Sequence, residues 1–295
     1  MASILDKIAN GGVLVSDGAM GTFLQAQGLN PGECPESWCI SRPEVVKGIA
    51  DAYIAAGSDV VETNSFGGSR FKLKEFGLEE SVAEFNRAAA SIAKSAMGDR
   101  GYVAASVGPT GQIAEDEGGW VSERELFDVF AEQVTALAEG GADALCIETM
   151  SSVIEATQAI KAAKEKTCLP VICTFTFEAG ARGFRTMMGA DVAEAVTAAV
   201  EAGADIVGAN CGNGIADMIE IAREIRAAVP GTPMMIQANA GKPVLEDGET
   251  VFKETPADMA ARVRELVEAG ASIIGGCCGT TPEHIQAIAE AVKRL

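Results

Sequence analysis

Four segments, AGSDVVETN at 56–64, GGADALCIE at 140–148, AGADIVGAN at 202–210 and AGASIIGGC at 269–277, form a weak internal repeat that decides the fold. Each contains the glycine that ends a helix, because glycine adopts the left-handed cap conformation without strain. Each then runs through an apolar strand to a polar residue or a cysteine at its carboxyl end. The repeat therefore predicts helices that alternate with strands.

The same alternation extends from Val13 to Leu295, with short β-branched runs between longer amphipathic stretches. Eight such units predict a closed parallel (β/α)8 barrel, the TIM barrel, as a single domain over 1–295. The four repeats are its even-numbered units. The predicted strands are 13–16, 59–63, 102–107, 144–148, 171–176, 206–210, 234–238 and 272–276, and the predicted helices are 43–56, 81–97, 122–139, 152–166, 191–202, 214–228, 256–269 and 282–294.

An open doubly wound sheet is the alternative fold, because it also alternates strands and helices. Such a sheet usually carries a glycine-rich phosphate loop after its first strand. The first turn here is DGAMGT at 17–22, which is not GxGxxG, and the chain has no Walker motif. The barrel is therefore the better prediction. We expect long loops on its active face, near 24–42, 110–121, 177–190 and 239–255.

Composition and charge limit the possible functions. Hydrophobic residues make up 48% of the chain, which allows a sizeable core, but no apolar run is long enough to span a membrane. Asp6 and Lys7 interrupt any signal peptide, so we expect a soluble, cytoplasmic protein. The net charge of −19 argues against nucleic acid as a partner. Eight cysteines then indicate packing or metal binding rather than disulfides.

Three cysteines follow predicted strand ends. Cys277 and Cys278 are adjacent in GGCCGTTP, and Cys211 follows the sixth strand in GANCGN. The carboxyl ends of barrel strands share one face, so the repeat directs these residues, with Asn64 and Glu148, to one region. Three thiolates and an open position suit a catalytic zinc. Small buried residues at the barrel rim are the alternative interpretation, and the pattern alone leaves both open.

The chain contains one histidine, His284, at the predicted start of the last helix. We expect it to be exposed and not catalytic. A single histidine largely excludes Ser-His and Cys-His nucleophile pairs and imidazole zinc sites. The chemistry must then come from carboxylates, amides, a metal and the backbone.

The chain contains seven short motifs: DGAMGT at 17–22, TNSFG at 63–67, SVGPTG at 106–111, IET at 147–149, GANCG at 208–212, NAG at 239–241 and GGCCGT at 275–280. Together they resemble the homocysteine S-methyltransferase family and look most like the homocysteine-binding module of cobalamin-dependent methionine synthase. The resemblance spans the chain from about Leu14 to Ala287. It implies a (β/α)8 enzyme that transfers a methyl group to the thiol of homocysteine and forms methionine.

The resemblance also implies a ligand set and a substrate site. Zn²⁺ is expected on Cys211, Cys277 and Cys278, with the homocysteine sulfur at its open position. Glu148 matches the acidic contact to the substrate's amino group, and Asn239 matches an amide that supports the same amino acid. Substrate contacts are also expected from Asn64 and from the turn at Asp17 and Gly18, whose backbone NH groups would receive the carboxylate.

The methyl donor implied by the resemblance is methylcobalamin, or another methyl-corrinoid, carried by a partner protein. Because the barrel accounts for the whole chain, we expect the donor to come from outside it. Betaine-using relatives have tyrosines where this chain has Gly67 and Thr149, which argues against betaine. S-methylmethionine remains open, because Trp38 and Trp120 lie in active-face loops, where they offer a π surface or simply anchor the loops.

Three further readings remain open. The donor is another small molecule, the acceptor of a corrinoid-linked reaction is a different thiol, or the protein is a non-catalytic zinc-binding subunit. Acidic residues in the loops 110–121 and 239–255 favour docking of a partner with a basic surface, although solvated loop charge explains them equally well. These residues are Glu115, Asp116, Glu117, Glu246, Asp247 and Glu249.

Overall fold

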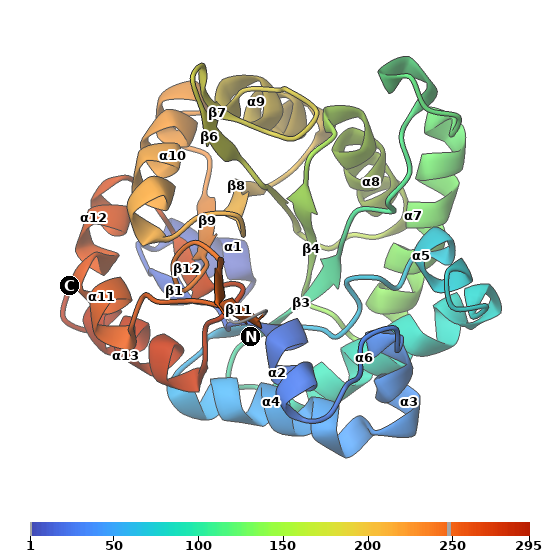
Figure 1. The fold of residues 1–295 in the computed structure, drawn as a ribbon, viewed down its shortest axis with the longest axis horizontal. Coiled ribbons are helices and arrows are strands. Elements are labelled where there is room, and N and C mark those ends of the chain that lie inside the picture. The colour runs from blue at the N-terminus through green and yellow to red at the C-terminus, as the bar shows by residue number, and fades with distance from the viewer. Residues whose placement is uncertain (1, 247–248) are drawn as a thin grey trace.

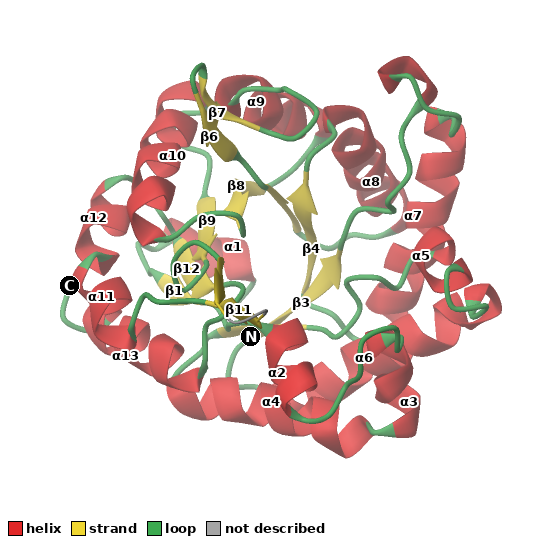
Figure 2. Ribbon diagram, viewed as in Figure 1, coloured by secondary structure: helices red, strands yellow, loops and turns green. Residues whose placement is uncertain are grey.

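The computed structural model describes residues 2–246 and 249–295, so the predicted rim residue Asp247 lies outside the described residues. Figure 1 shows a ring of parallel strands surrounded by helices, viewed onto the face that carries the long loops. Figure 2 shows the strands at the centre and the helices outside them. The predicted (β/α)8 barrel is confirmed.

All eight predicted strands are present, with ends within two residues of the predicted ones. They form one parallel sheet in the order β1-β12-β9-β8-β5-β4-β3-β2. A parallel bridge between Ser16 and Val60 brings the two outer strands together. The strands are β1 Leu14–Val15, β2 Val60–Glu62, β3 Tyr102–Val107, β4 Ala144–Met150, β5 Val171–Phe175, β8 Ile206–Asn210, β9 Met234–Ala238 and β12 Ile273–Gly276.

The predicted barrel helices are also present, except that 256–269 is divided into two helices at Arg262. No helix within 2–246 or 249–295 has the length and hydropathy needed to cross a bilayer. The barrel helices are α4 Pro43–Ala56, α6 Val82–Met97, α7 Glu123–Glu139, α8 Val153–Lys166, α9 Val192–Ala202, α10 Ile215–Ala228, α11 Pro256–Ala261, α12 Val263–Glu268 and α13 Pro282–Val292.

Short elements, each too brief for sequence periodicity to reveal, lie in or beside the four predicted long loops and in the stretch 70–81. Two pairs of antiparallel strands lie there: one within 177–190, in which Ala179 pairs with Phe184, and one between 244–246 and 249–251, in which Val244 pairs with Val251. These elements build up the rim of the barrel mouth (Figure 1). The short elements are α2 Met20–Ala26, η1 Pro35–Ser37, α3 Trp38–Ser41, α5 Arg70–Lys74, η2 Glu79–Ser81, η3 Glu115–Glu117, β6 Glu178–Gly180, β7 Gly183–Arg185, β10 Val244–Glu246 and β11 Glu249–Val251.

A further helix, α1 Ile4–Ala9, closes the amino-terminal end of the barrel and was not predicted. Its Ile4 is buried in the inner core together with Tyr102 and Cys146. The Tyr102 hydroxyl donates to the Ala2 carbonyl oxygen at 3.0 Å, which holds the segment before the helix against the barrel. Cys146 therefore lies inside the barrel.

The aspartate in three of the repeats joins each even-numbered strand to the strand before it. Asp205 donates its backbone NH to the Val171 oxygen at 2.8 Å, and its Oδ2 accepts from the Val171 NH at 2.8 Å. Lys164 on α8 pairs with the same carboxylate at 2.6 Å. The fourth repeat has Ser272 at this position and makes only the backbone bond. The same pair of bonds joins Asp143 to Val103 and Asp59 to Val15.

We expect Asp205→Ala to lower the free energy of unfolding by about 1 to 2 kcal/mol, because the Val171 NH and Lys164 both lose their charged partner. Urea denaturation measures this change. Glu201→Ala is the matched control, since Glu201 is an exposed carboxylate on the neighbouring helix α9. Equal unfolding midpoints for the two variants would show that the repeat's aspartate does not hold the strands.

Candidate active site

Three cysteine sulfurs meet at the carboxyl ends of β8 and β12. The Sγ atoms of Cys211, Cys277 and Cys278 all lie within 4.8 Å of one another. The Cys211 and Cys278 sulfurs are 3.7 Å apart. We call these three residues the sulfur trio. Such a set of soft ligands, half-buried and facing a cavity, fits Zn²⁺ with one coordination position left for a substrate.

Backbone hydrogen bonds fix the two segments that carry the sulfur trio. The Cys211 NH donates to the Gln237 oxygen at 3.1 Å, and the Cys277 NH donates to the Ala238 oxygen at 2.8 Å. Both acceptors belong to β9, which lies between the two strands. Gly276 allows the tight turn after β12, because a Cβ there would stand 2.4 Å from Thr280 Oγ1.

Within 2–246 and 249–295, two residues other than glycine have a left-handed backbone, and both lie at this site. Cys211 has φ 62° and Thr149 has φ 60°. This conformation is uncommon for residues with a side chain and costs of order 1 to 3 kcal/mol. At Thr149 it coincides with an irregularity in the pairing of β4 with β5. Strain is therefore concentrated where the sulfur trio meets the end of β4.

The thiols of the sulfur trio influence one another's ionisation. Hydrogen bonds from Cys277 and Cys278 lower the pKa of the Cys211 thiol to about 3. The same contact with Cys211 raises the pKa of Cys277. The first thiolate therefore forms readily, whereas further ionisation needs a cation to offset the added negative charge.

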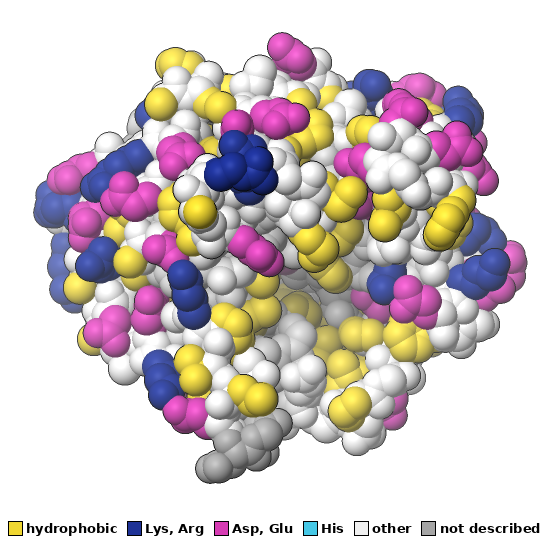
Figure 3. Space-filling view, turned by 45° about the horizontal axis from the view of Figure 1, so that its top comes forward, with side chains coloured by type: hydrophobic (Ala, Val, Ile, Leu, Met, Phe, Trp, Pro, Cys, Tyr) yellow, Lys and Arg dark blue, Asp and Glu magenta, His cyan; other side chains and the backbone are white. Residues whose placement is uncertain are grey.

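A cavity of about 300 Å³ opens at the mouth of the barrel beside the sulfur trio. Figure 3 shows a hollow on this face with hydrophobic side chains around it. None of the described lining residues is a lysine, arginine or histidine, whereas three are glutamates. The lining includes the sulfur trio, Gly18, Ala19, Met20, Glu36, Glu62, Asn64, Phe66, Ser106, Glu148, Thr149 and Gln237.

Glu148 is buried at the end of β4 and connects the cavity to the sulfur trio. Its Oε1 accepts from the Ser106 hydroxyl, and its Oε2 accepts from Asn210 Nδ2 at 3.2 Å. The same Nδ2 donates to Thr149 Oγ1 at 2.7 Å and lies 4.0 Å from the Cys277 sulfur. Burial, followed by the charge of Glu62, raises the pKa of Glu148 well above its usual range.

The structure places the other predicted substrate residues at different distances from the cavity. Gly18 and Asn64 line it. Asn64 also supports the wall, because its Nδ2 donates to the Pro35 oxygen at 2.8 Å. Asp17 is buried behind Gly18, with its Oδ2 bound to the Glu62 NH at 2.8 Å. Asn239 is buried beside Cys211 and is absent from the cavity lining, and its Oδ1 has no partner.

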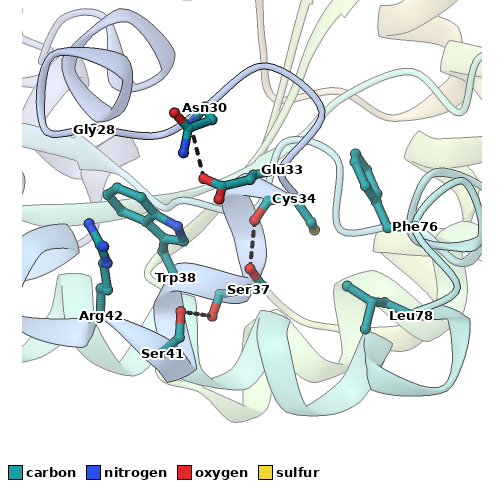
Figure 4. A pocket seen from close by; sticks show the side chains of 10 residues that line it. All are labelled: Gly28, Asn30, Glu33, Cys34, Ser37, Trp38, Ser41, Arg42, Phe76 and Leu78. Carbon is teal, nitrogen blue, oxygen red and sulfur yellow. Dashed lines mark hydrogen bonds between the residues drawn. The ribbon is translucent and has the colours of Figure 1, made fainter.

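Neither tryptophan lines the cavity. Trp38 is 5% exposed and its ring is covered by the Arg42 guanidinium at 4.4 Å. Figure 4 shows both side chains in a second hollow, between the segment 28–42 and residues 76–78. Trp120 is 84% exposed on the loop that follows β3. Trp38 is thus an anchor of the wall, and Trp120 stands in solvent at the rim.

The expectation of an exposed His284 is wrong, because this side chain is only 8% exposed. Its Nδ1 lies 3.2 Å from the Thr281 NH in a capping box at the start of α13. Its Nε2 lies 3.0 Å from the Glu254 carbonyl oxygen. The imidazole is buried because it joins the helix start to the loop after β11, and it does not line the cavity.

Two site residues were missed by the sequence analysis although the repeat contains their signal. Asn210 holds the last position of the third repeat, the position that Glu148 and Cys277 hold in theirs. Glu62 lies two residues before Asn64, and residues two apart point to the same side of a strand. A position-by-position alignment of the repeats would have predicted that both side chains point into the barrel.

Comparisons with known proteins agree with this geometry. Residues 14–292 match the sequence model of the homocysteine S-methyltransferase family. The methionine synthase of Mycobacterium tuberculosis (strain ATCC 25618 / H37Rv) is 30% identical over 301 residues, which cover 96% of this chain and 25% of that protein. The methionine synthase of Mycobacterium leprae (strain TN) is 30% identical over 300 residues, which cover 96% of this chain and 24% of that protein. This chain spans about a quarter of the length of these curated relatives.

Solved structures share the fold. The metallated form of the homocysteine methyltransferase MmuM from Escherichia coli has a TM-score of 0.79 and 22% identity, and the likeness covers 94% of this chain and 96% of that one. At this identity the likeness supports the barrel alone. The sequence match carries the assignment, and it confirms the predicted resemblance: the chain belongs to the homocysteine S-methyltransferase family.

Proposed function

We propose that this protein transfers a methyl group to the sulfur of homocysteine, with Zn²⁺ held by the sulfur trio. The observation that carries the proposal is the position of the sulfur trio, which lines the same cavity as the buried carboxylate of Glu148. A thiol that also carries an ammonium group would meet both. The family assignment supports homocysteine as that thiol.

The donor atoms fit zinc better than a hard cation such as Mg²⁺, because all three are sulfur. Zinc held there would favour the thiolate form of an incoming thiol at its open position. Cys211 follows β8, and Cys277 and Cys278 follow β12, with β9 between these two strands. The backbone bonds to β9 fix these positions before the substrate arrives.

The protein's own residues would orient the amino acid. Glu148 would pair with the substrate ammonium, because a desolvated cation needs a countercharge. The turn at Asp17 and Gly18 would receive the carboxylate through backbone NH groups, and Asn64, which also lines the cavity, would border it. Asn239, with a free Oδ1 beside Cys211, would support the sulfur end of the substrate.

Replacing Cys278 with alanine should leave two sulfurs and greatly weaken zinc binding, with loss of methyl transfer. Metal analysis after dialysis against a chelator measures the zinc retained per chain. Cys168→Ala is the matched control, because Cys168 is an exposed free cysteine far along the chain from the sulfur trio. Full retention of zinc by the Cys278 variant would remove this residue from the ligand set.

Glu148→Gln should weaken homocysteine by at least about tenfold more than it weakens 4-mercaptobutyrate, which is homocysteine without the amino group. The variant removes the countercharge of a buried ammonium, and a buried charge without a partner weakens binding by several kcal/mol. Calorimetric titration of the zinc-loaded protein with each thiol gives both affinities. An equal loss for the two thiols would assign Glu148 a structural role instead.

For the donor, we propose a methyl-corrinoid carried by a separate protein. The two positions that carry tyrosine in betaine-using relatives offer no aromatic cage here. A Cβ at Gly67 would stand 2.9 Å from Glu36 Oε1, which accepts from the Gly67 NH at 2.7 Å. Thr149 is held by Asn210 through both its NH and its hydroxyl.

The rim of the mouth favours a large donor. Phe66, Trp120, Met187 and Leu245 are exposed hydrophobic residues on different loops of this face. Glu115 and Asp116 of the predicted acidic rim lie in η3, near Trp120. Exposed apolar residues on one face mark interaction surfaces, and acidic neighbours favour a basic partner.

The donor assay offers zinc-loaded protein and homocysteine with methylcobalamin, S-methylmethionine or betaine, and follows methionine formation. We expect slow turnover with free methylcobalamin, because the reaction needs the methyl-cobalt bond in line with the sulfur and no carrier protein places it there. We expect no turnover with betaine. Rapid turnover with S-methylmethionine alone would contradict the corrinoid proposal while leaving the zinc site and the homocysteine pocket in place.

A further inference from the structure

Three carboxyl groups from three strands of the barrel lie at or just behind the wall of the cavity. Glu62 lies at the end of β2, Glu148 lies on β4, and Asp17 follows β1. Glu62 and Asp17 are linked directly, because the Glu62 NH donates to Asp17 Oδ2 at 2.8 Å. We call these three residues the acid cluster. Glu62 and Glu148 line the cavity itself, whereas Asp17 is buried behind it.

Glu62 has no cation among the described residues around it. Its Oε1 accepts from Gln237 Nε2 on β9 at 3.0 Å. The titratable groups that face it are Asp17 from the first turn and Cys146 and Glu148 from β4, all neutral or negative. The side chain therefore gains a hydrogen bond from Gln237 but no charge compensation.

Buried carboxyl groups whose charges raise one another's pKa do not all ionise together. Burial, with the charge of Asp17 as the second cause, raises the pKa of Glu62 to about 8. Burial likewise raises the pKa of Asp17 to about 7. The empty acid cluster therefore holds protons at neutral pH, and an arriving ammonium supplies the positive charge that allows a carboxyl group to ionise.

We propose that Glu62 is a specificity-determining residue that holds a proton in the empty pocket and releases it to solvent when the ammonium of an amino-acid thiol enters. This inference rests on the proposed function. The exchange balances: the neutral Glu62 carboxyl loses one proton to the buffer, and the resulting carboxylate pairs with the positive charge of the ammonium. No other bond forms or breaks at Glu62.

The exchange links substrate choice to pH. Because the ammonium lowers the pKa of Glu62 from its value of about 8 in the empty pocket, the carboxyl group ionises on binding only below that pH. Homocysteine affinity should therefore rise with pH toward about 8 more steeply than the affinity of a thiol without an amino group. For each thiol, the slope of the logarithm of the binding constant against pH equals the number of protons released on binding.

The test counts the protons released when homocysteine or 4-mercaptobutyrate binds to the zinc-loaded protein at pH 7, by calorimetry in buffers of different ionisation enthalpy. Both free thiols are mostly protonated at this pH, so each releases close to one proton if its sulfur binds as a thiolate. We expect homocysteine to release roughly half a proton to one proton more than 4-mercaptobutyrate.

Glu62→Gln, which keeps an acceptor for Gln237, should remove most of this excess. Glu62→Asp should retain it, because a carboxyl group that titrates is still present. Glu155→Gln is the matched control, since Glu155 is a buried carboxylate bound to Thr110 outside the cavity, and its replacement should leave the excess unchanged.

Equal proton counts for the two thiols in the wild-type protein would overturn the proposal while leaving the proposed function intact. The same excess in the Glu62→Gln variant would also overturn it, by assigning the proton to another group. Failure of either thiol to bind the zinc-loaded protein would overturn the proposed function and this inference together.

Discussion

Two aspartate side chains close the barrel where its first and second strands meet, and the positions of the reacting groups depend on that closure. Asp59 Oδ2 accepts from the Val15 NH at 2.9 Å, and Asp17 Oδ2 accepts from the Glu62 NH at 2.8 Å. Side chains thus complete a seam at which the strands themselves share a single bridge. Because the ring is closed, Glu62 reaches Gln237 across the interior, and the carboxylates of β2 and β4 share one cavity with the sulfurs that follow β8 and β12.

The cavity collects negative charge that the chain does not offset. The sulfur trio supplies up to three thiolates, Glu62 and Glu148 lie beside them, and the described lining contains no basic side chain. Such a site costs stability unless cations enter it, because buried charges need partners. In the proposed function, a divalent metal at the sulfurs and a substrate ammonium at the carboxyl groups would be the two cations. In the proposed exchange, protons on the acid cluster would take the place of the ammonium when the substrate is absent.

The alternation of apolar runs and amphipathic stretches was sufficient to predict the barrel, because each β-branched segment is buried on both faces and each helix begins and ends at clear signals. The sulfur trio was predictable for the same reason, since its residues follow strand ends. The helix α1 and the rim hairpins were not, because six-residue and three-residue elements carry too little periodicity. Burial of His284 was also beyond reach, because it depends on a loop that packs against the helix start only in three dimensions. Asn210 and Glu62 needed the repeats to be compared position by position.

The central claim is that the sulfur trio holds zinc and presents it to the sulfur of homocysteine. X-ray absorption at the zinc edge tests this most directly, with the zinc-loaded protein measured before and after homocysteine is added. The account predicts three sulfur neighbours at about 2.3 Å with one lighter ligand before addition, and four sulfur neighbours afterwards. A zinc environment that does not change when homocysteine is bound would contradict the account.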